Sequence, residues 1–347
     1  MLHASYTRYI LQFKAPSGTS RGILTERETF FVKIFDDTNP ALSGAGECAV
    51  FRGLSADDIP GYENFLANVC LNIEEYKDNF REKLKHFPSI VCGLEMAFAD
   101  LRNGGVRRPF PSVFSYGKDF IRINGLIWMG TKESMRQQII EKIEEGFSCI
   151  KLKIGAIGFD EELELLKQIR KEFNQKTIEL RVDANGAFAP EQALAKLSEL
   201  AKLDLHSIEQ PIRTGEHEIM ADLCRKSPLP IALDEELTGC FEKQEKLRLL
   251  QKIRPQYIVL KPSLHGGFCG TQEWIDIAQE LQIGWWITSA LESNTGLNAI
   301  AQWTYLQNNN LPQGLGTGRL YINNVPPEPC LKGEKLYVGT IPETQRQ

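Results

Sequence analysis

The chain has 347 residues, with 40 Lys and Arg against 45 Asp and Glu, which gives a formal net charge of −5. This balance argues against a dedicated nucleic-acid-binding protein, whose contact surface is normally basic. No apolar run approaches the roughly 20 residues of a membrane-spanning helix, and the N-terminus shows no signal-peptide cleavage site. We therefore expect a cytoplasmic protein with neither a nucleic-acid nor a membrane partner, built as about two average domains or as one barrel with a smaller domain.

The cysteines and histidines give no metal-binding pattern. The 8 cysteines are scattered without a CxxC pair, and the 5 histidines without HxxH or HExxH. In a chain of this length, this usage is typical of reduced, mostly buried thiols. Any metal is therefore expected on carboxylates, which are the ligands that suit Mg²⁺.

Residues 1–121 are predicted to form a separate α+β domain. Three β-rich segments separated by turns come first, and two segments of helical character follow them, because strands and then helices in succession are typical of α+β domains. The predicted strands are 10–18, 23–37 and 44–51, and the predicted helices are 57–84 and 89–103.

Residues 122–318 show a repeating alternation of apolar strands and helical stretches. The predicted strands are 122–129, 149–155, 177–185, 206–211, 230–237, 257–264 and 284–293, with a short eighth at 313–318. Such alternation predicts βαβ units and a parallel sheet, and seven or eight units match a (β/α)₈ barrel. A doubly wound sheet is the alternative, but GxGxxG and Walker A motifs are absent. The tail 319–347 is expected to pack back against the N-terminal domain.

Charged residues fall near the end of each predicted barrel strand, at intervals of roughly 25 to 30 residues, about one βα unit. In barrels the active site lies at the C-terminal ends of the strands, and buried charges are costly unless they are paired or bind a metal. The residues concerned are Lys151, Lys153, Asp183, Glu209, Asp234 and Lys261. We therefore expect the active site at this end of the barrel.

Three of these residues are acids on neighbouring strands, so their carboxylates are expected to converge. Asp183, Glu209 and Asp234 would repel one another in a single pocket unless a cation lies between them. Oxygen ligands alone favour Mg²⁺. The alternative interpretation is that each acid caps a helix or pairs with a lysine.

The lysines indicate proton transfer. Lys151 and Lys153 alternate with Leu152, so both ammonium groups point to one face of the strand. Two adjacent cations beside a metal lower each other's pKa, which makes a neutral lysine base accessible. Lys261 is expected on the opposite wall, an arrangement suited to proton abstraction beside a carboxylate, with the metal holding the enediolate. Taken alone, the KxK pattern is also typical of a solvated surface strand.

The ordered motifs resemble those of one family. KLKIG, RVDANGAF, SIEQPI, ALDEEL, VLKPSLHGG and SALESNTG, preceded by GAGECAVFRGLS and LEMAFADL, are similar to the enolase superfamily and its muconate-lactonising-enzyme-like subgroup, over nearly the whole chain. The resemblance implies a modified TIM (β/α)₇β barrel over 122–318. It also implies an α+β capping domain formed by the N-terminal segment 1–121 and the C-terminal tail 319–347.

Within the subgroup the chain is most similar to the o-succinylbenzoate synthases, carbon–oxygen lyases of menaquinone biosynthesis. The resemblance implies a Mg²⁺-dependent syn dehydration of 2-succinyl-6-hydroxy-2,4-cyclohexadiene-1-carboxylate, with Mn²⁺ as a possible substitute. Lys153 would be the base and then the acid, and Lys261 the opposing lysine. The other implied roles are support of the base (Lys151), metal ligation (Asp183, Glu209, Asp234), ligand orientation (Asn185, Glu235), substrate contact (Ser263, Ser289, Glu292) and closure over the substrate (15–25).

The alternatives are an N-acylamino acid racemase or another epimerase or cycloisomerase of the same superfamily, a catalytically silent barrel, and a glycosidase. N-acylamino acid racemases of the same superfamily share these motifs and use two opposed lysines. An acidic D-x-D, typical of dipeptide epimerases, is absent where Ser289-Ala-Leu-Glu292 stands. A catalytically silent barrel has no reason to keep so costly a cluster of charges, and a glycosidase with paired carboxylates would not need the lysines. The sequence does not indicate the oligomeric state.

Overall fold

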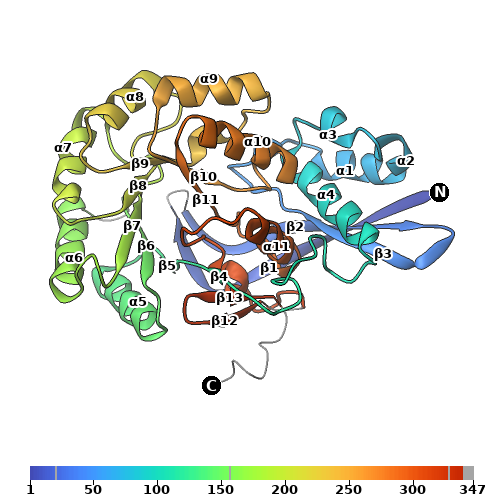
Figure 1. The fold of residues 1–347 in the computed structure, drawn as a ribbon, viewed down its shortest axis with the longest axis horizontal. Coiled ribbons are helices and arrows are strands. Elements are labelled where there is room, and N and C mark those ends of the chain that lie inside the picture. The colour runs from blue at the N-terminus through green and yellow to red at the C-terminus, as the bar shows by residue number, and fades with distance from the viewer. Residues whose placement is uncertain (20–21, 156–157, 327–328, 339–347) are drawn as a thin grey trace.

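The structure is a computed structural model that describes residues 1–19, 22–155, 158–326 and 329–338. Figure 1 shows two parts. One side of the molecule is a barrel with helices packed around it, and the other side is a smaller cap formed mostly by the N-terminal part of the chain. The cap's long strands extend to the barrel strands, so the two parts meet beside the barrel opening.

The cap contains a three-stranded antiparallel sheet with order β1-β2-β3, formed by β1 (Leu2–Thr19), β2 (Gly22–Asp36) and β3 (Asn39–Cys48). Its helices are α1 (Tyr62–Leu71), α2 (Ile73–Tyr76), α3 (Phe80–Lys83) and α4 (Pro88–Arg102). The predicted helix 57–84 is therefore three shorter helices. At Asn72 the side-chain amide donates to the carbonyl of Asn68 at 2.9 Å, a local bond that competes with continued helix formation.

Helix α4 lies directly on β3, and glycine makes this contact possible. A Cβ atom on Gly46 would lie 1.9 Å from the carbonyl oxygen of Gly93, and one on Gly44 would lie 1.9 Å from that of Ala97. Any side chain at these positions would push the helix off the sheet. The GAGE motif therefore sets how closely α4 packs, and it holds the next residue, Glu47, beside the barrel.

The barrel is a seven-stranded parallel sheet with order β11-β10-β9-β8-β7-β6-β5. Its strands are β5 (Gly125–Ile127), β6 (Cys149–Lys153), β7 (Glu179–Asp183), β8 (Ser207–Glu209), β9 (Ile231–Leu233), β10 (Tyr257–Leu260) and β11 (Gly284–Ile287). The helices between and after them are α5 (Lys132–Glu144), α6 (Phe159–Glu172), α7 (Pro190–Ala201), α8 (His217–Lys226), α9 (Lys243–Ile253), α10 (Gly267–Glu280) and α11 (Asn294–Leu306).

The eighth position of the barrel is filled by a very short segment. Gln313 forms a parallel bridge with Ile123, and Gly314 forms one with Thr288, so residues 313–314 lie between the two ends of the sheet. The chain then enters the 3₁₀ helix η2 (Gly316–Arg319). The predicted modified (β/α)₇β barrel with an α+β cap is confirmed, although this last strand is shorter than the predicted 313–318.

The barrel strands end at, or just before, the charged residues of their motifs. The predicted strand 230–237, for example, ends at Leu233, and the 3₁₀ helix η1 (Glu235–Leu237) follows it. Outside the sheet, the apolar residues that alternate with the polar ones pack against the helices in one continuous core, including Ile150, Leu152 and Val182. The strand ends are thus free to turn their polar side chains inward.

The C-terminal segment contacts both parts of the molecule. The carbonyl of Leu320 accepts a hydrogen bond from the amide of Lys14 at 2.8 Å, and Tyr321 bridges to Phe13 of β1. Further on, β12 (Cys330–Lys332) and β13 (Lys335–Tyr337) form a small sheet with β4 (Ile121–Arg122), where the chain enters the barrel. The proposed division at 121/122 and 318/319 stays a prediction.

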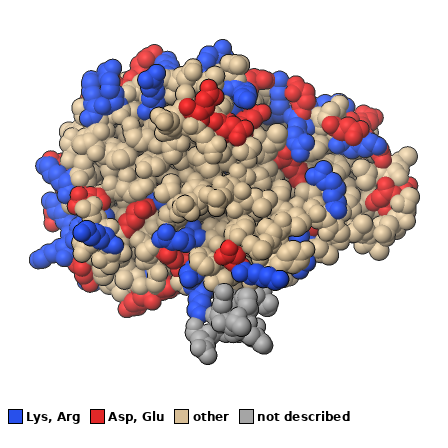
Figure 2. Space-filling view, in the orientation of Figure 1, with Lys and Arg blue, Asp and Glu red and all other residues tan. Residues whose placement is uncertain are grey.

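The surface charges and the cysteines in the structure are those expected from the composition of the sequence. Within the described ranges, no helix combines the length and apolar character needed to cross a membrane. Figure 2 shows basic and acidic side chains interspersed around the rim of the face in view, with uncharged residues over its centre. All eight cysteines, each of which lies in the described ranges, are free.

Candidate active site

Strand register brings the charged side chains together. Lys153 of β6 pairs with Asp183 of β7, and Asp183 pairs with Glu209 of β8. Glu209 pairs with Ala232 of β9, and Asp234 follows two residues later, on the same face. Because parallel strands present their carboxyl ends at the same rim, the three acids and the lysine meet at one mouth of the barrel.

The three acids form a buried site that fits a divalent cation. One oxygen from each of Asp183, Glu209 and Asp234 lies within 4.8 Å of the others, and all three side chains are buried. The Oε1 atom of Glu209 has no hydrogen-bond partner among the described residues. Burial, together with the charges of Asp183 and Asp234, raises the pKa of Glu209 to about 8. A site with three ionised carboxylates therefore requires additional positive charge.

Two lysines of β6 lie against these acids. The Lys151 ammonium contacts Asp183 at 2.9 Å and also pairs with Glu209, while Lys153 lies 3.3 Å from Asp183. Burial lowers the pKa of Lys151, but the carboxylates of Asp183 and Glu209 outweigh burial and raise it above its ordinary value. The sequence predicts a lowered lysine pKa. That lowering requires a bound cation that neutralises the carboxylates.

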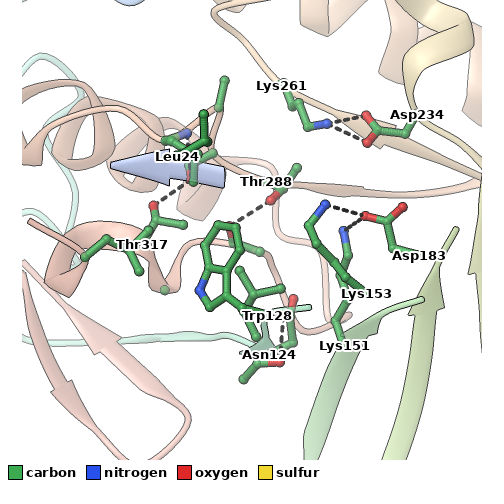
Figure 3. A pocket seen from close by; sticks show the side chains of 18 of the residues that line it. Leu24, Asn124, Trp128, Lys151, Lys153, Asp183, Asp234, Lys261, Thr288 and Thr317 are labelled. Atoms are coloured by element: carbon green, nitrogen blue, oxygen red, sulfur yellow. Dashed lines mark hydrogen bonds and ion pairs between the residues drawn. The ribbon is translucent and has the colours of Figure 1, made fainter. Parts of the chain in front are cut away.

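Lys261 lies on the opposite wall. It follows β10, which is separated from β6 by β7, β8 and β9 in the sheet. Its ammonium lies 2.5 Å from each carboxylate oxygen of Asp234. Figure 3 shows Lys261 with Asp234 on one side of the site and Lys151 and Lys153 with Asp183 on the other. The expected opposition of the two lysine walls is present in the structure.

Asn185 and Glu235 form a second layer behind Lys153. Asn185 Oδ1 accepts a hydrogen bond from the Lys153 ammonium at 2.8 Å, and its Nδ2 donates to Glu235 Oε1 at 2.9 Å. Asn185 has a φ of 42°, a left-handed conformation that asparagine adopts more readily than most residues. The RVDAN motif therefore turns at Asn185 and points the amide back toward Lys153.

A cavity of about 540 Å³ lies over these groups. One part of its lining is polar and mostly charged, and is formed by Lys151, Lys153, Asp183, Asn185, Asp234, Glu235 and Lys261. Another part is apolar and is formed by Leu24, Phe51, Leu54, Trp128, Leu291 and Leu320. The cavity therefore suits a small ligand that carries a carboxylate on one side and an apolar body on the other.

Comparison with known proteins identifies the family. The profile of the family described as "Enolase C-terminal domain-like" matches residues 134–329, and the o-succinylbenzoate synthase of Desulfotalea psychrophila is 44% identical over 97% of this chain and 99% of its own. The chain belongs to the enolase superfamily. The crystal structure of MenC from Desulfotalea psychrophila superposes with a TM-score of 0.83 at 42% identity, covering 97% of this chain and 99% of that one. An N-succinylamino acid racemase of Amycolatopsis is 26% identical over 94% of this chain and 89% of its own.

The three residues predicted to contact substrate occupy different environments in this enolase-superfamily chain. Ser289 lines the cavity, and its hydroxyl lies 2.6 Å from that of Thr317. Ser263 and Glu292 are not part of the cavity lining in the described structure. They are fully buried, and the Ser263 hydroxyl donates to Glu292 Oε1 at 2.6 Å. The chain turns after β10, and this turn directs Ser263 away from the site.

The segment 15–25, which was expected to close over the substrate, is mostly strand. It forms the tip of the β1–β2 hairpin, where Gly18 bridges to Met129 beyond β5. Leu24 from this hairpin lines the cavity, whereas residues 20–21 lie outside the described residues. The cap therefore supplies part of the cavity wall.

Sequence reasoning missed two kinds of site residue in this superfamily member. The first is the apolar lining, since Trp128 and Leu320 carry no motif of their own and lie far apart in the chain. The second is Gln210, whose Oε1 accepts from the amide of Asp234 at 3.2 Å and whose Nε2 donates to Glu236 at 3.0 Å. The signal in the sequence was the glutamine that directly follows Glu209, the acid at the end of β8. Its side chain supports Asp234, the acid that follows the next strand.

Proposed function

We propose that this chain is an o-succinylbenzoate synthase that dehydrates 2-succinyl-6-hydroxy-2,4-cyclohexadiene-1-carboxylate in menaquinone biosynthesis. The observation that carries the proposal is the 44% identity to an o-succinylbenzoate synthase over nearly the full length of both chains. The buried acids, the opposed lysines and the partly apolar cavity match the chemistry that this reaction requires.

We assign Asp183, Glu209 and Asp234 as the ligands of a Mg²⁺ ion, for which Mn²⁺ would substitute. Three buried carboxylate oxygens within 4.8 Å of one another match the preference of Mg²⁺ for oxygen ligands. When bound, the cation would stabilise the negative charge that develops on the substrate carboxylate. Gln210 holds the backbone of Asp234 for this purpose.

Lys153 carries the proton transfers. The neutral amine removes the proton from the carbon beside the carboxylate, and the electron pair of that C–H bond moves toward the carboxylate as an enediolate. The electrons then return to the ring, the C–O bond to the neighbouring hydroxyl breaks, and the Lys153 ammonium donates its proton to the departing hydroxide. Water leaves and the ring becomes aromatic. One lysine serves both transfers because a syn elimination places both groups on one face.

The other polar residues hold these groups in place. The Lys261 ammonium on the opposite wall would attract the enediolate charge. Asn185 orients Lys153 through the 2.8 Å hydrogen bond, and Lys151 pairs with the acids Asp183 and Glu209. We place the reaction in the cytoplasm, which fits a chain whose eight cysteines are all free, and its partner is a small carboxylate.

The test is loss of the substrate's diene absorbance upon addition of the protein and Mg²⁺. We expect Lys153→Ala and Lys261→Ala each to lower kcat by about 10²- to 10⁴-fold, the usual contribution of a positioned acid or base. Lys171→Ala, an exposed lysine of α6, is the matched control and should keep the wild-type rate. Circular dichroism would establish that the variants fold. Wild-type rates in either active-site variant would overturn the two-lysine mechanism.

A second activity, racemisation of N-acylamino acids, is favoured by one feature of the site. Lys153 and Lys261 lie on opposite walls, so each could serve one face of an α-carbon. Deuterium incorporation at the α-carbon of N-succinyl amino acids in D₂O measures this activity directly. We expect it to be slower than the dehydration, and exchange faster than dehydration would make racemisation the main reaction.

A further inference from the structure

Trp128 and Lys153 lie at the ends of neighbouring barrel strands. β5 and β6 are parallel, with Gly125 opposite Ile150 and Ile127 opposite Leu152. Trp128 directly follows Ile127, and Lys153 directly follows Leu152, so both residues come immediately after the last pair of this register. Ile127 and Leu152 pack outward into the core shared with the helices, so the residues that follow them point inward. Both line the cavity, and Figure 3 shows the indole projecting into it.

A side chain of α5 holds this tryptophan in place. Gln138 Oε1 accepts a hydrogen bond from the backbone amide of Trp128 at 2.9 Å, and Gln138 Nε2 donates to its carbonyl at 3.3 Å. β5 ends at Ile127, so the strand ladder does not continue to this residue. The glutamine amide takes the place of a neighbouring strand and fixes the backbone from which the indole projects.

The indole is also part of an apolar wall shared by the cap and the barrel. Trp128 belongs to the same apolar cluster as Leu24 and Phe51 from the cap and Leu291 and Leu320 from the barrel and the C-terminal segment. All five line the cavity. Among them, Trp128 is the one that directly follows β5, the strand paired with β6 of Lys153. The indole therefore presents a flat apolar surface to the same cavity that Lys153 lines.

We propose that Trp128 is a specificity-determining residue whose indole packs against the ring of the substrate, and that Gln138 is its positioning residue. The inference rests on the proposed dehydration and adds the group that selects a cyclic diene over an acyclic acyl amino acid. The indole packs against the diene face of the substrate, and stacking contributes beyond simple area burial once the product ring is aromatic. A flexible acyclic chain offers no such face, so the same residue favours one substrate class.

The kinetic test compares Trp128→Leu and Trp128→Phe with the wild type. We expect Trp128→Leu to raise KM for the cyclohexadiene substrate about ten-fold and to change kcat little, the pattern of lost binding that is uniform along the reaction. Trp128→Phe should restore most of the affinity because it keeps an aromatic face. KM for an N-succinyl amino acid should stay within about two-fold of wild type in both variants.

Gln138→Met tests the positioning role, and Gln137→Met is its matched control. Gln137 is the neighbouring, exposed residue of α5, and it bonds Glu141 at 3.1 Å. We expect Gln138→Met to raise KM for the cyclic substrate, by less than Trp128→Leu does, and Gln137→Met to leave it unchanged. A purely structural role of Gln138 would lower the melting temperature without changing the preference between cyclic and acyclic substrates.

Product binding provides a readout that does not require turnover. Titration with o-succinylbenzoate should change the tryptophan fluorescence of the wild type, and Trp128→Phe should lose most of this change while still binding. Trp285→Phe, a substitution of a tryptophan buried in the barrel core, should keep it. An unchanged KM in Trp128→Leu, or a full fluorescence change in Trp128→Phe, would overturn the inference. A wild type that neither binds this product nor consumes the diene would instead refute the proposed function.

Discussion

At the scale of single residues, the least replaceable neutral side chain of the site is Asn185. Its oxygen accepts from the base Lys153, and its nitrogen donates to Glu235, so the amide has one defined orientation. The residue also needs a φ of 42° to reach both partners. The motif RVDAN thus combines Asp183, a proposed metal ligand, with a turn that directs the amide of Asn185 to Lys153.

We expect Asn185→Gly to lower kcat about 10- to 100-fold, the usual effect of removing a residue that orients a site group. Glycine adopts the left-handed φ without strain, so the fold and the melting temperature should be kept. Asn308→Gly is the control, because Asn308 has a φ of 50° and is exposed. If both variants keep full activity in steady-state assays, Asn185 does not orient Lys153.

At the scale of secondary-structure elements, the N-terminus of α4 is capped by a buried carboxylate. Asp57 Oδ2 accepts hydrogen bonds from the amide of Ser89 at 2.9 Å and from its hydroxyl at 2.5 Å. Asp57 Oδ1 has no partner in the described structure. Burial raises the pKa of Asp57 from 3.8 to about 6. The hydrogen bonds that Asp57 accepts at the N-terminus of α4 are therefore sensitive to pH.

The folded-state pKa of Asp57 is above the unfolded one, so the folded protein binds this proton more tightly. Its contribution to stability is complete below pH 3.8 and is lost as the pH rises through about 6. Over this pH range the wild type should lose about 3 kcal/mol of its free energy of unfolding. We expect Asp57→Asn, which keeps an oxygen acceptor but does not titrate, to abolish this loss. Chemical denaturation at pH 4, 5, 6 and 7 measures it.

The exposed Asp78→Asn serves as the control for this experiment and should leave the pH profile as in the wild type. Parallel profiles for the wild type and Asp57→Asn would show that Asp57 does not titrate in this range.

At the scale of the whole molecule, the cap and the barrel are joined by buried charged side chains. Glu47 of β3 accepts from the amides of Ser293 and Gly296, at 2.9 and 2.8 Å, at the start of α11. Arg27 of β2 donates to the carbonyl of Leu291 at 2.7 Å. These contacts fix the loop after β11, which carries Leu291 and Ser289 into the cavity. The cavity wall therefore depends on both parts of the molecule.

The cation site links strands β7, β8 and β9, so a cation that binds only the folded protein should stabilise the whole barrel. We expect saturating Mg²⁺, at about 100 times its Kd, to add about 2.7 kcal/mol to the free energy of unfolding. Glu209→Gln should lose this gain because an amide is a weaker ligand than a carboxylate. Thermal melting with Mg²⁺ and with a chelator measures it, and Glu218→Gln, an exposed acid, is the control. An equal Mg²⁺ shift in Glu209→Gln would place the cation elsewhere.

The sequence alone was enough to predict the barrel and its ionic groups. The period of βα units sets which residues end a strand, and parallel strands bring those ends to one rim, so Asp183, Glu209 and Asp234 were predictable as neighbours, with Lys261 on the opposite wall. The alternation of Lys151 and Lys153 with Leu152 is likewise a local property of a strand.

Which side chains complete the cavity depends on the tertiary structure. Ser289 lines it, whereas Ser263 does not, because the turn after β10 directs Ser263 toward Glu292. The apolar wall joins Leu24 to Trp128 across more than a hundred residues of chain. Such contacts depend on how the cap docks on the closed barrel, and no local pattern of residues encodes that docking.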